Sequence, residues 1–134
     1  MKGIKTSSIF HGVGRRKSSV ARVWLKNGNG NVLVNGLDYK KYFDTDVTKQ
    51  TAIDPVSITN LKQNFDIQVN VQGGGMVSQA GAVRLGLSRA LIEMDEDLRP
   101  ALKRIGFLSC DSRVKERKKY GQKAARRKFQ FVKR

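Results

Sequence analysis

The chain contains one cysteine, Cys110, and one histidine, His11, in 134 residues. A single cysteine cannot form a disulfide within the chain, so the cysteine content gives no sign of secretion. These two residues lie far apart and do not make a zinc site, and we expect no metal or other cofactor. We assign a structural role to His11 and a free thiol to Cys110. With so few groups for acid–base or nucleophilic chemistry, we predict that the protein is not an enzyme.

Long apolar runs are also absent. No stretch approaches the roughly 18–20 apolar residues that a membrane-spanning helix needs. The first ten residues, MKGIKTSSIF, lack the apolar segment of a secretory signal. We therefore expect no membrane contact, although a precursor with a transit peptide is compatible with this sequence.

Acidic residues are few: 11 Asp and Glu stand against 27 Lys and Arg, a formal net charge of +16. The last 24 residues, 111–134, hold eleven of the cations and only two acids, and thus +9 of the charge. We call this segment the arm, and residues 1–110 the body, which we expect to be one domain. Such an excess of one sign indicates a polyanionic partner.

In the first half of the body we expect strands over residues 9–26, interrupted by glycines. The Asn27–Gly30 tetrapeptide favours a hairpin turn, because Asn and Gly tolerate positive φ. This predicts a returning strand over residues 31–35. A short helix is expected over Leu37–Phe43, beginning at Leu37 or Asp38. The polar residues 44–54 are predicted to form a loop, followed by a short helix that starts with Pro55 and ends near Asn64.

The second half has clearer periodicity. Residues 65–72 alternate apolar and polar side chains without a fault, which predicts a strand with one buried face. After three glycines, an apolar stripe from Ala80 to Met94 predicts a helix over 78–94. Gly81 and Gly86 weaken this helix, which is tolerable if they let it approach the sheet or a phosphate. A last helix opens at residues 95–97, with Leu98, Leu102 and Ile105 as its apolar face and Gly106 as its C-cap.

The Gly73–Gly75 segment joins a strand to a helix, as in many phosphate cradles. It lacks the Lys-Ser/Thr ending of a nucleotide-binding loop, so we do not expect nucleotide hydrolysis or another small-molecule substrate. A plain turn and a contact with an RNA backbone both remain open. The cluster Arg15–Lys17 is compatible with a solvated edge strand, but the many other cations of the body favour phosphate contact.

The arm is compatible with a disordered solubilising tail. Its aromatic residues Tyr120, Phe129 and Phe131 favour RNA instead, because such rings stack on bases. We also predict a helix over 113–123, in which Glu116 pairs with Lys119 or Tyr120.

The chain resembles small-subunit ribosomal protein nine of the bacterial or organellar type over nearly its whole length. The resemblance is carried by Gly12-x-Gly14-Arg15-Arg16-Lys17 with Ala21-Arg22, by Val34-Asn35-Gly36, by Gly73-Gly74-Gly75-x-x-Ser78-Gln79-x-x-Ala82-x-x-x-Gly86-x-Ser88-Arg89-Ala90-Leu91, and by Arg113-x-x-Glu116-Arg117-Lys118-Lys119, Ala125-Arg126-Arg127, Gln130-Phe131 and Lys133-Arg134. Cys110, Phe129 and Val132 depart from the family's usual residues.

This resemblance implies an α+β fold, ribosomal S-five domain-two-like, with a mixed sheet, two main helices on one face, a left-handed βαβ crossover and an extended basic C-terminal tail. It implies a structural protein of the small-subunit head that binds the 3′ domain of the small-subunit rRNA and adjoins neighbouring head proteins. The tail is expected to reach the tRNA in the peptidyl site. The ribosome would be cytoplasmic or, alternatively, that of a plastid or mitochondrion.

We accordingly expect rRNA contacts from the glycines after the clear strand, from cations of both parts and from one amide: Arg15, Arg16, Lys17, Arg22, Gly73, Gly74, Gly75, Gln79, Arg84, Arg113, Arg117, Lys118, Lys119, Lys123, Arg126, Arg127 and Lys128. The tRNA contacts are expected from Phe131, Lys133 and Arg134. Two rivals are weaker: a metal-dependent nuclease using the dispersed Asp38, Asp44, Asp46, Asp54 or Asp66, and a free-standing nucleic-acid chaperone.

Overall fold

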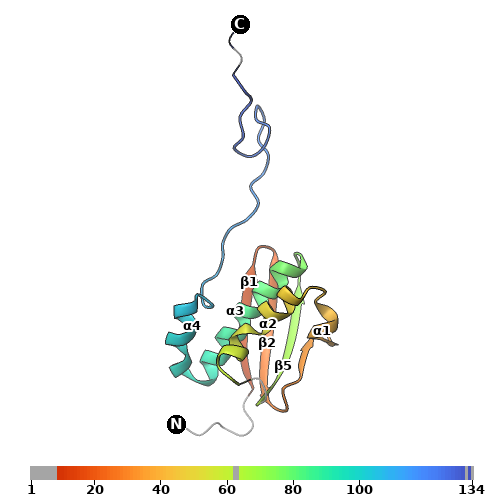
Figure 1. The fold of residues 1–134 in the computed structure, drawn as a ribbon, viewed down its shortest axis with the longest axis vertical. Coiled ribbons are helices and arrows are strands. Elements are labelled where there is room, and N and C mark those ends of the chain that lie inside the picture. The colour runs from red at the N-terminus through yellow and green to blue at the C-terminus, as the bar shows by residue number, and fades with distance from the viewer. Residues whose placement is uncertain (1–8, 62–63, 132, 134) are drawn as a thin grey trace.

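The computed structural model describes residues 9–61, 64–131 and 133 (Figure 1). The strands are β1 (Phe10–Arg16), β2 (Ser19–Asn27), β3 (Val32–Val34), β4 (Leu37–Asp38) and β5 (Phe65–Gln72). The helices are α1 (Tyr39–Tyr42), α2 (Asp46–Ile58), α3 (Met76–Met94) and α4 (Arg99–Ile105), with a 3-10 turn, η1 (Glu96–Leu98), before α4. None of the helices described here has the length and apolar character needed to cross a membrane.

The strands form one mixed sheet in the order β1-β2-β5-β3-β4. The pairs β1–β2, β2–β5 and β3–β4 are antiparallel, and β3 lies parallel to β5. Parallel neighbours need a crossover, and here it contains β4, α1 and α2. The predicted α+β class and mixed sheet are confirmed, while the hand of the crossover stays a prediction.

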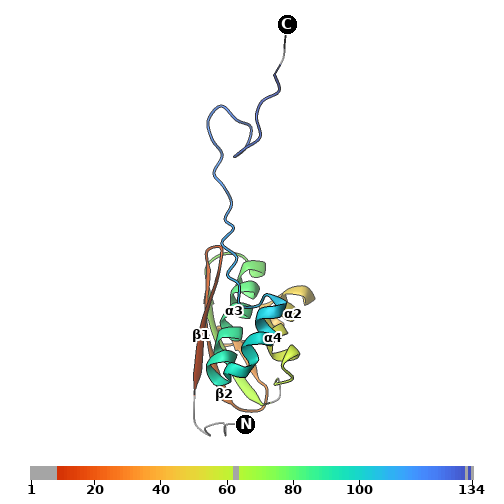
Figure 2. The ribbon, with the colours of Figure 1, turned by 90° about the vertical axis from the view of Figure 1, so that its left-hand side faces the viewer.

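The helices cover one face of the sheet, and Figure 2 shows α2, α3 and α4 on the same side. The inward side chains of β2 and β5 are buried, among them Val23, Leu25 and Val69. Leu87 and Leu91 of α3 are buried in the same core. The alternation over residues 65–72 and the apolar stripe of α3 therefore predicted this layer correctly, including the two main helices on one face.

Glycines set the distance between β1 and α3. A Cβ atom added at Gly12 would lie 2.1 Å from the Gly86 carbonyl oxygen. One added at Gly14 would lie 1.9 Å from the Ala82 carbonyl oxygen. Strand and helix backbones are thus in direct contact, which confirms that Gly86 lets α3 approach the sheet.

The predicted hairpin at Asn27–Gly30 is wrong, because β2 pairs with β1 and β5 and not with β3. The Asp66 carboxylate accepts the backbone amides of Asn29 and Asn31 at 3.0 and 2.9 Å, which fastens this loop to β5. These amides, Asn31 first, lower the pKa of Asp66 below its usual value. The hairpins are instead β1–β2, which turns at Lys17 (φ 52°), and β3–β4, which turns at Asn35 and Gly36 (φ 50° and 81°).

The predicted loop over 44–54 is also wrong, since α2 begins at Asp46 and contains Pro55 within it. The segment looks polar because its outer face carries pairs such as Lys49–Asp46 (3.2 Å). Its inner face consists of a threonine and small or medium apolar residues, Thr48, Ala52, Ile53 and Val56. The burial of that face against α3 stabilises the helix, and propensity alone does not show it.

Smaller differences between prediction and structure occur at α1 and α4. Asp38 does cap α1, accepting the Lys40 amide at 3.0 Å, but Leu37 belongs to β4. Gly106 is the predicted C-cap of α4, with φ 87°. Ile105, predicted to be on the apolar face, is 48% exposed.

The described part of the arm, 111–131 and 133, contains neither helix nor strand, so the helix predicted over 113–123 is wrong (Figure 1). Glu116 does pair with Lys119, at 2.6 Å, as predicted. Four cations surround this one acid over residues 115–119. Like charges and the lack of an apolar face to pack outweigh the pair in a short segment.

Candidate nucleic-acid interface

Three segments meet at the end of the body from which the arm leaves: the β1–β2 turn, the glycine turn after β5 and the start of α3 (Figure 1). A Cβ atom added at Gly73 would lie 2.4 Å from the Ser18 carbonyl oxygen, so two of these turns touch. Gly73 and Gly74 have φ values of 79° and 64°, which glycine adopts at no steric cost. The triple glycine therefore makes a tight turn beneath the hairpin.

A hydrogen-bond network holds the glycine turn in place. The Gly73 carbonyl accepts the Ser19 hydroxyl at 2.8 Å and the Gln79 side-chain amide at 3.1 Å. The Ser78 hydroxyl accepts the Gly75 amide at 3.0 Å. The Tyr42 hydroxyl donates to Gln79 at 2.8 Å, which ties α1 to the same turn. Gln79 is buried and supports the turn from within.

The start of α3 faces outward beside this turn. Met76 and Val77, its first two residues, are 41% and 64% exposed. Gly75 precedes them as an N-cap without a side chain, and a Cβ atom there would meet nothing within 4 Å. The positive end of a long helix is therefore accessible, which favours anions.

Arg16 crosses α3 at this end. Its guanidinium donates to the Val77 carbonyl at 3.5 Å. A Cβ atom at Gly81 would lie 2.5 Å from Arg16 Cδ, so the missing side chain of Gly81 makes room for the arginine. This explains Gly81, the first glycine of α3, which lies against the Arg16 side chain.

Four arginines surround a pocket of about 150 Å³ at the base of the arm. Arg15 and Arg16 come from β1, Arg84 from α3 and Arg113 from the arm. The guanidinium carbon of Arg84 lies 5.0 Å from the centre of the Phe107 ring, which also lines the pocket. We call this group the arginine pocket.

Asp111 is the acidic residue of the arginine pocket. It accepts two bonds from the Arg113 side chain, at 2.9 and 2.8 Å. These bonds hold the pKa of the Asp111 carboxyl well below its usual range and raise the pKa of Arg113. The charge of Arg16 acts in the same direction on Asp111. A carboxylate thus already occupies a position where oxyanions are stabilised.

The cations of the arm lie in solvent. Glu116 pairs with both Lys119 and Arg126, at 2.6 and 2.9 Å, and draws residues 116–126 into a loop. Tyr120 and Phe131 are 96% and 87% exposed. The Lys123 ammonium lies 5.7 Å from the centre of the Phe129 ring. Rings and cations of this segment are both free to meet a nucleic acid.

The structure brings together Arg15, Arg16, Lys17, Gly73, Gly74, Gly75, Arg84 and Arg113 at one end of the molecule. Arg22 lies apart, on the sheet face away from the helices, opposite Val13 and Asn70. The remaining predicted cations, Arg117, Lys118, Lys119, Lys123, Arg126, Arg127, Lys128 and Lys133, follow along the arm. Arg134, like the divergent Val132, lies outside the described residues.

Sequence reasoning missed Phe107, Asp111, Ser19 and Tyr42 as parts of this end. The first two line the arginine pocket and the last two hold the glycine turn. A polar residue such as Ser19, buried at the start of a strand, gives no signal in a hydrophobic pattern. Only the pair Asp111–Arg113 had a local signal, its spacing of two residues.

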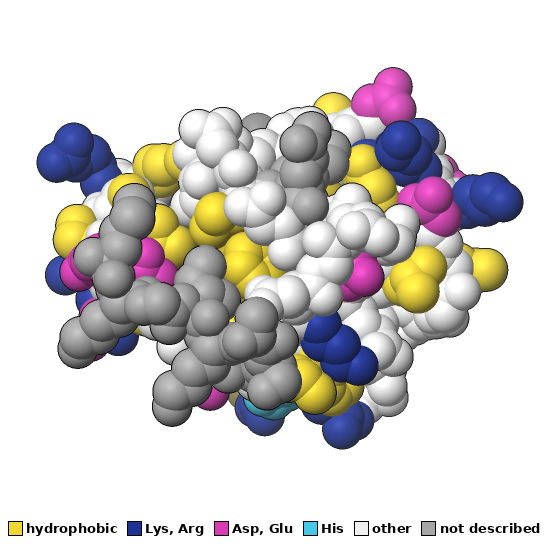
Figure 3. All heavy atoms as spheres, turned by 90° about the horizontal axis from the view of Figure 1, so that it is seen from below, with side chains coloured by type: hydrophobic (Ala, Val, Ile, Leu, Met, Phe, Trp, Pro, Cys, Tyr) yellow, Lys and Arg dark blue, Asp and Glu magenta, His cyan; other side chains and the backbone are white. Residues whose placement is uncertain are grey.

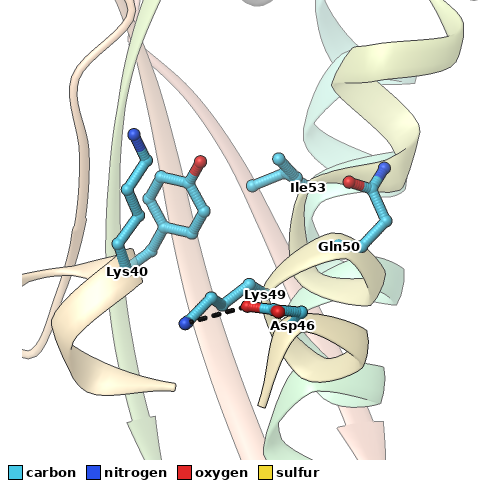
Figure 4. A pocket seen from close by; sticks show the side chains of 6 residues that line it. Lys40, Asp46, Lys49, Gln50 and Ile53 are labelled. Carbon is cyan, nitrogen blue, oxygen red and sulfur yellow. Dashed lines mark hydrogen bonds and ion pairs between the residues drawn. The ribbon is translucent and has the colours of Figure 1, made fainter. Parts of the chain in front are cut away.

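A larger pocket, of about 320 Å³, lies between α1 and α2 (Figure 4). Lys40, Lys49 and Asp46 line it, and Lys49 already pairs with Asp46. In the described parts of the chain, no three Asp, Glu, His or Cys residues gather as metal ligands do. The carboxylates of Asp38 and Asp66 instead accept backbone amides.

The opposite end of the body differs. Among the side chains that Figure 3 colours, hydrophobic and uncharged groups cover much of this end, and Lys and Arg lie at scattered positions. For the residues that the structure describes, the arginine pocket is thus at the other end.

Comparison with known proteins gives the family of this chain. The family described as Ribosomal protein S9/S16 matches residues 14–134. This chain belongs to the S9 family. S9 relatives include the small ribosomal subunit protein uS9 of Mesomycoplasma hyopneumoniae strain 7448, 52% identical over 125 residues, which are 93% of this chain and 95% of the relative. The uS9 protein of Chlorobium limicola is 52% identical over 126 residues, covering 94% and 98% of the two chains.

The suspected resemblance is thus confirmed at the level of the family. An S9 protein is a constituent of the small ribosomal subunit and not an enzyme. The nuclease rival is thereby set aside. The S5-domain-two-like description agrees with the five-stranded mixed sheet and its helices.

Proposed function

We propose that this protein binds the 3′ domain of the small-subunit rRNA in the head of the subunit, with its arginine-rich end against the RNA backbone. The observation that carries the proposal is the arginine pocket, a space of about 150 Å³ that Arg15, Arg16, Arg84 and Arg113 line together. Arginine forks match phosphate oxygens in geometry and charge. A pocket of this size suits a single backbone phosphate.

The glycine turn adds a second contact region beside the arginine pocket. The Gly73 and Gly74 backbones lie at the surface, and no side chain prevents close approach. The exposed N-terminus of α3 adds its positive dipole end. Contacts of this kind fix the position of a protein on RNA without reading sequence.

The arm neutralises phosphates deeper in the RNA, and its tip reaches the tRNA in the peptidyl site. Phe131, Lys133 and Arg134 are the tip residues that meet the tRNA. Support comes from the composition of the arm, with eleven cations in 24 residues, and from the exposure of Phe131. Neighbouring head proteins are the remaining partners.

The ribosome concerned is a cytoplasmic one, since the similar uS9 proteins come from bacteria. A plastid or mitochondrial ribosome is the alternative. Purified subunits from the cytoplasm and from organelles of the source cell distinguish them by where the protein sediments.

Crosslinking and sequencing of the bound RNA in cells tests the function. The full chain is compared with one truncated after Ala125, which removes the tip. We expect reads in the 3′ domain of small-subunit RNA for both chains, and tRNA reads only for the full chain. Reads scattered over many RNAs contradict the proposal and favour a general chaperone of nucleic acids.

A further inference from the structure

The face of the sheet that points away from the helices carries a surface that the phosphate contacts do not use. Figure 2 shows no helix on this side. Alternate residues of β1, β2 and β5 point there, because their neighbours point into the core. Its members from β1 and β2 are His11, Val13, Arg15, Val20, Arg22, Trp24 and Lys26, and from β5 they are Asp66, Gln68, Asn70 and Gln72. We call it the open face.

An aromatic pair lies near its middle. His11 and Trp24 are directly opposite in the β1–β2 register, with ring centres 5.3 Å apart and planes tilted by 44°. His11 is exposed and Trp24 half-buried. The row continues across the sheet to Gln68 and then to Leu33, which is 43% exposed. The two rings offer a flat group a surface on which to stack.

Hydrogen-bonding groups flank the aromatic pair. Gln68, Asn70 and Gln72 project at every second residue of β5, and all three are exposed. Their side chains make no hydrogen bond with another described residue, in contrast to Asn35, whose amide pairs with the Val71 backbone. Three amides in a line offer donors and acceptors to a ligand that has both.

Among the described residues, the charged side chains of the open face that have no hydrogen-bond or ion-pair partner are positive. Arg22 lies opposite Asn70, and Arg15 shares a row with Gln72 through Val20. Three carboxylates contact or border it, Asp66, Asp38 and Glu93, and each accepts a backbone amide, in the case of Glu93 that of His11 at 2.6 Å. Arg15 also lines the arginine pocket, so the open face continues into the phosphate site.

A solvated face is the ordinary condition of an antiparallel sheet, but such a face does not require aromatic rings beside unpaired amides. A protein partner would need larger exposed apolar area than Leu33 and the half-buried valines provide. Stacking rings, base-edge donors and acceptors, and cations for phosphates together suit single-stranded RNA, which other proteins bind on sheets in this way.

We propose that the open face binds a single-stranded segment of RNA, with a base stacked on the Trp24–His11 pair. The amides of β5 meet base edges or riboses, and Arg22 meets a phosphate. The inference rests on the proposed function for the class of partner, but it adds a base-contacting surface distinct from the arginine pocket and the arm. The RNA strand passes between the two surfaces at Arg15.

The chain's single tryptophan provides a direct test. The full chain is titrated with an octamer of single-stranded RNA, and in parallel with inorganic polyphosphate of similar charge, while Trp fluorescence is recorded. Both polyanions bind the arm, but only RNA has bases that stack. We expect quenching by RNA and no change with polyphosphate.

Variants of Trp24 and Leu33 test whether the tryptophan ring itself contacts the RNA. Trp24→Ala should weaken RNA binding about tenfold, the loss of one stacked base, and leave polyphosphate binding unchanged. Trp24→Phe should retain most of the affinity, since a ring remains. Leu33→Ser, on the same row but without a ring, is the matched control and should bind RNA normally. Circular dichroism confirms that each variant is folded.

Several results overturn the proposal. Unchanged fluorescence while RNA binds tightly shows that RNA does not use the open face. Equal quenching by polyphosphate shows that charge alone causes the signal. If Trp24→Ala and Leu33→Ser bind RNA normally but fail to join neighbouring proteins, the open face is a protein interface. If the unmodified chain does not bind small-subunit RNA at all, the proposed function itself is rejected. This outcome can be told apart from the three above, which reject only the role of the open face.

Discussion

The body and the arm hold their cations in two different ways. In the body, Arg16 reaches a backbone carbonyl across Gly81, and Arg84 lies over the Phe107 ring. In the arm, the described cations that have partners pair mostly with Asp111 and Glu116 at exposed positions. The fold thus pre-arranges the first set, whereas the second set can change partners at little cost.

Under the proposed function, we expect this difference to divide RNA recognition between body and arm. Pre-arranged arginines lose little conformational freedom on binding and would define where the RNA backbone lies. The arm would contribute charge neutralisation, which weakens as salt rises. We therefore expect position to come from the body and a large part of the affinity from the arm.

The largest effect is expected from Gly14→Val, which disrupts the packing of the body and with it the pre-arranged arginines. The new side chain would collide with the Ala82 carbonyl, 1.9 Å from the Cβ position. Separation of β1 from α3 should cost about 3 kcal/mol of unfolding free energy. Chemical denaturation measures it. Gly75→Ala, where a Cβ meets nothing within 4 Å, is the control and should lose no more than about 1 kcal/mol, because Ala is a poorer N-cap than Gly. Equal stability of the two variants would show that the backbone contact is not tight.

Next in size is deletion of Lys133 and Arg134, which tests the tip alone. Assembly into the subunit should be nearly intact, because the body and most of the arm remain. The affinity of peptidyl-site tRNA should fall about tenfold, as charge-assisted contacts are lost. Filter binding of tRNA to purified subunits measures this. Lost assembly with unchanged tRNA affinity would reverse the division of labour.

A smaller effect is expected from Arg84→Gln, which removes one pre-arranged cation. The binding free energy for a 3′-domain fragment should weaken by about 1 kcal/mol. The slope of log affinity against log salt concentration should fall by the amount that corresponds to about one phosphate contact. Arg99→Gln on exposed α4 is the matched control, since Arg99 pairs only loosely with Glu96, at 3.9 Å. If both substitutions act alike, the arginine pocket has no special role and the body binds by overall charge.

The smallest effect concerns Asp66→Ala, at the start of β5 and outside the arginine pocket. Loss of the bonds to Asn29 and Asn31 should cost about 1 kcal/mol of stability at neutral pH. The pKa of Asp66 is lowered in the folded state, so its contribution is complete above its unfolded pKa of about 3.9. It disappears as pH falls through the lower folded value. Denaturation at pH 7 and near pH 2 should show a difference in stability between variant and parent that shrinks with acid.

Local patterns predicted much of the body. The faultless alternation of residues 65–72 and the stripe of α3 each reflect burial on one face, which sequence records directly. The order of the strands was not predictable in this way. Asn27–Gly30 has ideal turn composition, but β5, which comes much later in the chain, pairs with both β2 and β3 and lies between them.

The sequence predicted which residue types form the candidate site, but not that these residues lie together. Each of Arg15, Arg84 and Arg113 is identifiable as a cation, but their convergence requires β1, α3 and the base of the arm to be brought together. The helix predicted over 113–123 was wrong because periodicity and one ion pair do not compensate for repulsion among neighbouring cations.

The position of β5 between β2 and β3 has a consequence for the order of folding during synthesis. The sheet cannot close until Gln72 has emerged, and the Gly12–Gly14 segment has no helix to rest on until α3 follows. Such distant pairings make folding slow. The arm follows the body in the chain, so every contact of the body is already available when the arm leaves the ribosome that synthesises it. The cations of the arm thus emerge only after the segments that build the body.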